Sequence, residues 1–293
     1  MTSRRLLTWL LAAVAVLAWT SSAPAAEGAA KDGGICGECH EQAKTFSATP
    51  HGRAGKPGEA ACVPCHGENA MKHAESGGDK SLIQLPAGRE GAETCLSCHD
   101  KSTEHKSFRD GVHQGTGPVN CLTCHAVHKA VGGVPGLLVK KDPKLCASCH
   151  PGPVSSFTSK PYAHKLGRGG MQCSSCHEPH GRHGKESLKE TKAGEIACLE
   201  CHTAQRGPFV FSHVDGAAGD CTSCHEPHGS SNPKQLKRAT VDGLCMECHT
   251  ILPGGNWGSR PPATHNLNFP RWRNCTTCHV AVHGSNRSPK LLK

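Results

Sequence analysis

The five-residue motif Cys-x-x-Cys-His occurs ten times in this chain and constrains its fold more than any other feature. The first copy begins at Cys36 and the last at Cys275, and consecutive copies begin 23 to 33 residues apart. In a c-type haem site the two thiols of such a motif bond to the porphyrin, and the adjacent histidine is the proximal ligand of the iron. The motifs use all 20 cysteines, so none remains for a disulfide, a nucleophile or another metal.

We therefore expect ten c-type haems. A structural zinc site would need four ligands around each ion and would not require a histidine directly after every second cysteine. A thioredoxin-like redox motif would occur once in a chain. The expected haem-bonding cysteines are Cys36, Cys39, Cys62, Cys65, Cys95, Cys98, Cys121, Cys124, Cys146, Cys149, Cys173, Cys176, Cys198, Cys201, Cys221, Cys224, Cys245, Cys248, Cys275 and Cys278. The expected proximal histidines are His40, His66, His99, His125, His150, His177, His202, His225, His249 and His279.

A second set of histidines repeats with the motifs and supplies the sixth iron ligands. The motifs group into five pairs, roughly 36–73, 95–128, 146–180, 198–228 and 245–283, and each pair carries one histidine before its second motif and one after it. The expected distal ligands are His51, His73, His113, His128, His164, His180, His213, His228, His265 and His283. His105 and His183 fall outside this repeat. We expect them to be surface residues or partners of the haem propionates. The spacing leaves open which distal histidine serves which haem.

Composition excludes an ordinary hydrophobic core. Aromatic residues make up 4% of the chain, which contains 34 Gly and 20 Pro, so the porphyrins must form the core and supply the folding energy. The predicted fold is a multihaem cytochrome c, mostly irregular with short α-helices and little or no sheet. The net charge of +9 does not indicate nucleic acid, because haem propionates add compensating negative charge and attract the lysines and arginines.

The first 25 residues are typical of a secretory signal peptide. Arg4 and Arg5 precede an apolar run from Leu6 to Trp19, and small residues lead to an expected cleavage after Ala25. The mature chain, residues 26–293, is then exported to the periplasm. After the signal, no apolar stretch approaches membrane-spanning length.

The ligand count favours electron transfer over catalysis. An iron with two histidine ligands has no open position for a substrate, so we expect no catalytic residues, and His/His ligation keeps reduction potentials low. Two alternatives stay open: a soluble periplasmic electron carrier that serves a terminal reductase, and a multihaem reductase enzyme.

Two segments, Cys198–His228 with its CHEPHG sequence and Cys275–Lys293, resemble the decahaem cytochromes of the MtrA/PioA/DmsE family, and the similarity covers the mature chain. The resemblance implies an elongated haem wire, often divided into pentahaem halves, here about 26–155 and 156–293. It also implies a porin–cytochrome complex at the outer membrane. The implied partners are an outer-membrane β-barrel that encloses the cytochrome, an extracellular multihaem cytochrome, and a periplasmic or inner-membrane quinol-oxidising cytochrome.

Overall fold

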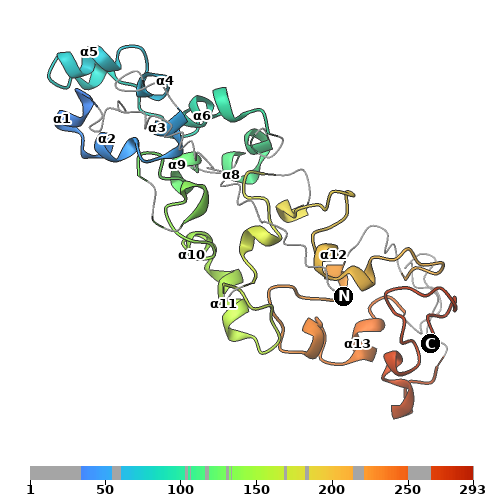
Figure 1. Cartoon of the computed structure of the whole chain (residues 1–293). Coiled ribbons are helices and arrows are strands. Elements are labelled where there is room, and N and C mark those ends of the chain that lie inside the picture. Colours follow the sequence, from blue (N-terminus) through green and yellow to red (C-terminus); the bar gives the residue numbers. More distant parts are fainter. Residues whose placement is uncertain are drawn as a thin grey trace, which may run out of the picture.

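The chain is elongated, with the first and last motifs at opposite ends (Figure 1). The computed structural model describes residues 34–54, 61–102, 105, 107–115, 119–129, 132, 134–167, 170–181, 185–213, 221–249 and 265–292. The predicted signal peptide and His183 lie outside these residues. No helix in the described ranges is long and apolar enough to cross a membrane.

Short helices are the main regular structure of the described residues. The α-helices are α1 (Cys36–Cys39), α2 (Glu41–Phe46), α3 (Pro50–Ala54), α4 (Val63–His66), α5 (Ala70–Glu75), α6 (Gly91–His99), α8 (Val112–Gly115), α9 (Cys121–Cys124), α10 (Lys144–Ala147), α11 (Pro151–Ser159), α12 (Cys198–Cys201) and α13 (Val241–Cys245). The 3-10 helices are η2 (Lys80–Leu82), η3 (Ser107–Asp110), η4 (Pro135–Leu137), η5 (Cys173–Ser175), η6 (Lys185–Ser187), η7 (Thr203–Gln205), η9 (Cys221–Ser223), η10 (Pro233–Gln235), η11 (Pro270–Trp272) and η12 (Cys275–Thr277). Pairing between extended segments is limited to isolated bridges, such as His125 with Leu138. The predicted fold class is therefore confirmed.

Each motif folds into roughly one helical turn. In nine motifs the histidine N–H donates to the carbonyl of the first cysteine at 2.8–2.9 Å, as His40 does to Cys36. In the remaining motif, Cys95 and His99 lie within α6. This i to i−4 spacing places the histidine and the first cysteine on the same side of the turn. The five residues of a motif thus build one attachment site locally.

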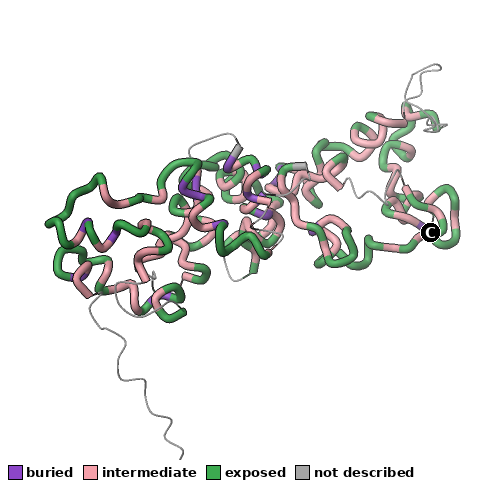
Figure 2. Tube along the Cα trace, turned by 90° about the horizontal axis from the view of Figure 1, so that it is seen from above, coloured by how far each residue is buried: buried purple, intermediate pink, exposed green. Residues whose placement is uncertain are grey.

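The described residues contain only a small apolar core. Their buried hydrophobic residues are Ala70, Ala92, Leu96, Phe108 and Ala197. Three of these, Ala92, Leu96 and Phe108, form one cluster, against which Cys121 packs. Figure 2 shows the buried positions scattered along the tube instead of gathered in one centre. Contacts between apolar side chains therefore do not explain how this chain holds its path.

Candidate haem sites: histidine pairs along the chain

The histidine rings associate in ten pairs, and each pair joins one motif histidine to one histidine of the second set. Ring centroids within a pair are 5.8–6.4 Å apart. The pairs are His40–His73, His66–His128, His99–His51, His125–His180, His150–His113, His177–His228, His202–His164, His225–His283, His249–His213 and His279–His265. All twenty histidines named from the sequence are used once. The repeat pattern thus found the partners, and the structure shows how they pair.

The spacing of these pairs fits two imidazoles on opposite sides of one iron. With metal–nitrogen bonds of about 2.0–2.1 Å and each ring centroid about 1.1 Å behind its nitrogen, trans ligands have centroids about 6.2–6.4 Å apart. The observed separations are at or slightly below this range. Interplanar angles vary from 12° to 75°, as expected for ligands that can rotate about the bond to the metal. The donor set and its geometry therefore fit haem iron.

The ring pairs divide the chain into four similar units, here called A (51–99), B (113–150), C (164–202) and D (213–249). The first and last residues of each unit are its paired histidines, as His164 and His202 are in unit C, at 6.2 Å. Motif 1 precedes unit A, and motif 10 follows unit D. This division lies one motif later than the grouping expected from the sequence, because four of the five histidines that precede a second motif pair with the next motif along, and His265 pairs with motif 10 itself.

A second kind of pair connects consecutive units. The histidine inside each unit, between its two motifs, pairs with a motif outside that unit. His128 of unit B pairs with His66 of unit A, and His180 of unit C pairs with His125 of unit B. Units C and D are connected in the same way, through His177. An iron held by such a pair would be a cross-link between neighbouring units.

Backbone carbonyls hold many of the rings in place. Five motif histidines have Nδ1 2.6–3.0 Å from a carbonyl oxygen further along the chain: His66, His125, His177, His225 and His279. An Nδ1–H that donates to a carbonyl leaves Nε2 as the free nitrogen, which fixes both the tautomer and the orientation of a metal ligand. These acceptors belong to turns such as η4, in which Gly136 provides the carbonyl for His125.

The first histidine of a unit also bonds to the following unit. His113 has Nδ1 2.9 Å from the carbonyl of Pro179, and His164 has Nδ1 3.0 Å from the carbonyl of Pro227. Pro179 directly precedes His180, which pairs with His125 of unit B. Pro227 directly precedes His228, which pairs with His177 of unit C. One contact therefore positions two ligands of different sites at once.

Burial favours the ligand form of six distal histidines. Burial lowers the pKa values of His51, His128, His180, His213, His228 and His283 from the ordinary histidine value, and neighbouring histidines lower them further. A neutral imidazole is the form that binds a metal. The folded chain thus presents these side chains ready to coordinate.

In the described residues, His180 is a distal histidine whose ring is hydrogen-bonded to a carboxylate, whereas His228 interacts with Glu226 through charge. Its Nδ1 lies 3.0 Å from Oε1 of Glu178, whose side chain is largely buried. A carboxylate that accepts this hydrogen bond makes an imidazole a stronger donor to metal. A stronger donor stabilises ferric over ferrous iron and lowers the reduction potential.

Replacing Glu178 should change the potential of one site. In Glu178→Gln we expect one haem potential to rise by tens of millivolts, an order-of-magnitude value for a lost charged hydrogen bond to a ligand. Spectroelectrochemical titration of the wild type and the variant measures it. Glu226→Gln, at the same position of the second CHEPHG segment, is the matched control and should give a smaller shift. Equal shifts in both variants would contradict the role of the hydrogen bond.

The structure adds a set of glycines that the sequence reasoning missed. Gly181, Gly229 and Gly284 each follow a distal histidine, and all have positive φ. A Cβ on Gly181 would lie 2.7 Å from Cα of Gly111, which is in the segment before His113. The signal was present in the sequence as a repeated His-Gly pair. These glycines let the segments that carry two ligands approach closely.

Gly181→Ala should therefore destabilise the contact between unit C and the segment that precedes unit B. With φ at +100° and a backbone contact at 2.7 Å, we expect a loss of about 1–3 kcal/mol in the free energy of unfolding. Urea titration of the haem-loaded protein measures the change. Gly152→Ala, where no atom lies within 4 Å of the added Cβ, is the control and should be nearly neutral. Equal losses in the two variants would refute the argument.

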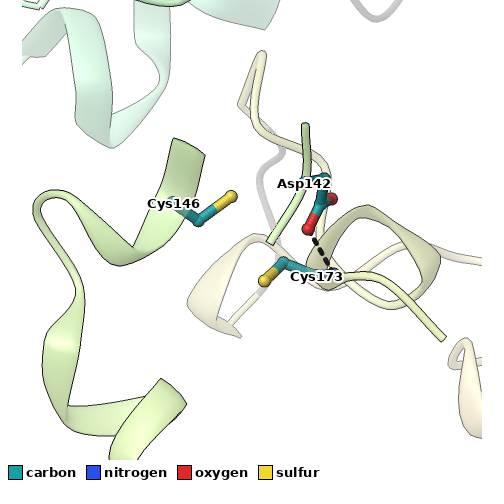
Figure 3. Close-up of side chains that lie close together, drawn as sticks. All are labelled: Asp142, Cys146 and Cys173. Carbon is teal, nitrogen blue, oxygen red and sulfur yellow. Dashed lines mark hydrogen bonds between the residues drawn. The ribbon is translucent and has the colours of Figure 1, made fainter. Parts of the chain in front are cut away.

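Asp142 connects the attachment turns of motifs 5 and 6 (Figure 3). Its two carboxylate oxygens accept the backbone N–H groups of Cys173 and Ser174 at 3.0 and 2.9 Å. Burial opposes the charged form of Asp142, but these hydrogen bonds outweigh it and lower the pKa of the carboxyl group. One atom each of Asp142, Cys146 and Cys173 lies within 4.8 Å of the others. Because both cysteines belong to haem motifs, we interpret Asp142 as a clamp between two attachment sites, not as a metal ligand.

His105 was expected to lie outside the ligand set, and the structure places it between two sites. Its ring contacts His99 at 5.6 Å and His180 at 4.7 Å between centroids, both nearly edge-on. Its Nδ1 lies 2.6 Å from the hydroxyl oxygen of Ser102. Both neighbours already have partners among the ten pairs, so His105 supports ligands of two sites.

Known proteins share these features. The family model described as "Doubled CXXCH motif" matches residues 164–207 and 213–252, which correspond to units C and D, and the model "Cytochrome c-type protein NrfB-like" matches residues 62–149. NrfB of Escherichia coli is 27% identical over 39% of this chain and 63% of the relative, and NrfB of Haemophilus influenzae is 29% identical over 30% and 43%.

A longer similarity covers most of the chain. The multiheme cytochrome MtrA of Shewanella baltica is 34% identical over 245 residues, which are 79% of this chain and 70% of the relative. The shared motifs mean that the chain binds c-type haem and functions in electron transfer. The chain therefore belongs to the MtrA family of multihaem c-type cytochromes.

Proposed function

We propose that this protein conducts electrons along ten bis-histidine c-type haems, between the periplasm and the outer membrane or extracellular side, within a porin–cytochrome complex. The observation that carries the proposal is the unbroken series of ten histidine pairs, which runs from one end of the molecule to the other. When bound, each haem supplies an iron that accepts and releases one electron. The residues of this chain attach, ligate and space those groups.

Interactions between cysteines connect motifs 2 to 10 in the order of the sequence. Within motif pairs 3–4, 5–6, 7–8 and 9–10 the first cysteines are neighbours, as Cys95 and Cys121 are. Between these pairs the second cysteine of one motif lies near the next motif, as Cys65 does to Cys98. Neighbouring attachment cysteines keep consecutive porphyrins in close proximity. The arrangement supports a linear conduit.

The pairs also support transfer over catalysis. In the described residues every motif histidine faces a second imidazole, so we assign the ten motif histidines as proximal and their ring partners as distal ligands. A site with both axial positions filled by protein leaves no place for a substrate. The pentahaem halves at about 26–155 and 156–293 remain a prediction. The pair His125–His180 crosses the boundary between these halves. The boundaries between units A and B and between units C and D are crossed in the same way, by His66–His128 and His177–His228.

The location and partners follow from export and from the family. We propose that residues 1–25 direct the chain to the periplasm and are removed. A polar, irregular chain cannot face lipid, where every backbone group must be satisfied internally, so crossing the outer membrane requires an enclosing β-barrel partner. An extracellular multihaem cytochrome at one end and a quinol-oxidising periplasmic or inner-membrane cytochrome at the other would complete the path.

A second candidate is a soluble periplasmic carrier. The observation that supports it is the match to the NrfB-like model, which is limited to residues 62–149 and so to motifs 2 to 5. A multihaem reductase is the third candidate and requires one iron with an open position. Electron paramagnetic resonance separates it from the others, because a reductase gives a high-spin signal and a carrier or conduit gives only low-spin signals.

Purification from native membranes tests the conduit. After detergent extraction of the outer-membrane fraction, the protein is followed by its haem absorbance. A stoichiometric β-barrel protein that co-purifies would support the proposal. Recovery of the cytochrome alone in the periplasmic fraction would refute it and favour the carrier.

A further inference from the structure

Charge is distributed unevenly along the chain. Residues 245–293 contain six Lys and Arg but one acidic residue, whereas residues 34–94 contain six Lys and Arg and eight Asp and Glu. Because motifs 1 and 10 lie at opposite ends (Figure 1), the asymmetry in sequence is also an asymmetry in space. The two ferric haems of motifs 9 and 10 would add about one negative charge each. The motif 10 end therefore stays positive even when its haems are counted.

The cations at this end are exposed, and although Arg273 interacts electrostatically with the carboxylate of Asp242, it forms no ion pair with it. In the residues that the structure describes, no ion pair involves the exposed side chains Arg271, Arg273, Arg287 and Lys290. Three arginines elsewhere in the described part of the chain form ion pairs with carboxylates: Arg109 with Glu93 at 2.8 Å, Arg206 with Glu195 at 3.0 Å, and Arg238 with Glu247. The positive charge at the motif 10 end is thus available to a partner.

Aromatic and apolar side chains lie among these cations. Phe269 and Val280 are 56% and 50% exposed. The Trp272 ring stacks on the His265 ring with centroids 4.6 Å apart and planes 5° apart, and the Arg271 guanidinium lies 4.6 Å from the Trp272 centroid. Arginine and aromatic residues are enriched where proteins bind one another. The exposed aromatic and apolar side chains distinguish this surface from a basic patch that only contacts solvent.

The same surface surrounds the last histidine pair. His265 is exposed and pairs with His279, whose Nδ1 lies 2.6 Å from the carbonyl of Lys290. We call Phe269, Arg271, Arg273, Val280, Arg287 and Lys290 the basic terminal face. A molecule bound there would lie beside the final site of the series.

We propose that the basic terminal face docks the acidic surface of an electron-transfer protein. The proposal rests on the proposed conduit, in which motif 10 is a terminal site, and it adds the chemistry of the partner. Complementary charge steers such a partner to the last site and away from the acidic motif 1 end. An enclosing barrel around the middle of an elongated chain would leave this end reachable.

Charge reversal tests the proposal in the haem-loaded protein. The test variant is R271E/R273E/R287E/K290E, and the matched control is K72E/K80E/R89E/K101E, which changes net charge equally at exposed residues of the other end. Stopped-flow absorbance follows reduction by an acidic [2Fe–2S] ferredoxin and, separately, by a neutral reduced phenazine. We expect about a tenfold fall in the ferredoxin rate for the test variant, less than twofold for the control, and falling wild-type rates as salt rises.

The outcomes separate this proposal from the conduit itself. Ferredoxin rates that do not depend on salt, or that fall equally in both variants, would overturn the docking face. Binding of the test variant is also compared on phosphatidylglycerol vesicles, and loss of vesicle binding with an unchanged ferredoxin rate would assign the face to a lipid surface and refute a protein partner. Wild-type haems that stay oxidised in an excess of the low-potential ferredoxin would count against the continuous conduit instead.

Discussion

A chain made without its haems is expected to lack stable tertiary structure. The two largest buried apolar side chains, Leu96 and Phe108, contribute about 1.5–3 kcal/mol each. Fixing the backbone costs about 1–2 kcal/mol for every ordered residue. The few buried apolar side chains of the described residues cannot offset that cost, so the groups that the histidine pairs and cysteines would hold are needed. Metal binding supplies folding energy in other small metal-dependent domains, so we expect the haem groups to supply the main stabilisation here.

The experiment compares the mature chain produced with and without cytochrome c maturation. We expect the haem-free chain to show little helical circular dichroism, fast amide hydrogen exchange and an expanded radius by size-exclusion chromatography. In the haem-loaded chain the amides should be protected from hydrogen exchange, and the chain should unfold cooperatively. A haem-free chain with protected amides and a sharp thermal transition would show that the polypeptide carries its own core, contrary to the argument.

Removing one distal histidine is expected to expose one iron in ten and to weaken the junction between two units. In His180→Ala the iron of motif 4 would lose the ligand that unit C provides, so about one tenth of the iron should become high-spin. That pair closes a loop of 55 residues between His125 and His180. By the loop-entropy relation for cross-links, it contributes about 4 kcal/mol to the free energy of unfolding.

Two further variants make the test quantitative. His265→Ala should also give one high-spin iron, but its pair with His279 closes only 14 residues, which corresponds to about 3 kcal/mol. His105→Ala is the control, because His105 lies next to His99 and His180 without belonging to a pair. Electron paramagnetic resonance and urea titration measure both effects. A high-spin signal in His105→Ala, or none in His180→Ala, would show that the ring pairs do not represent ligand pairs.

The sequence by itself determined the attachment sites, because all their information is local. A motif such as Cys36–His40 needs only one helical turn to bring two thiols and an imidazole to one side. Composition likewise predicted short helices and a small core, since few aromatic residues and many Gly and Pro cannot build anything larger. The repeat also identified the ten histidines that became ring partners, but it grouped the motifs one position too early.

Only the tertiary structure decided which histidines meet, because that depends on the path of the chain over 14 to 62 residues. The histidines before and after a motif both repeat with it in the sequence, yet one pairs within its own unit and the other with the preceding unit. The close approach of Gly111 and Gly181 and the clamp at Asp142 arise the same way, from segments that are distant in sequence. Local chemistry therefore determined what each site is made of, and the folded path determined the order in which the sites are connected.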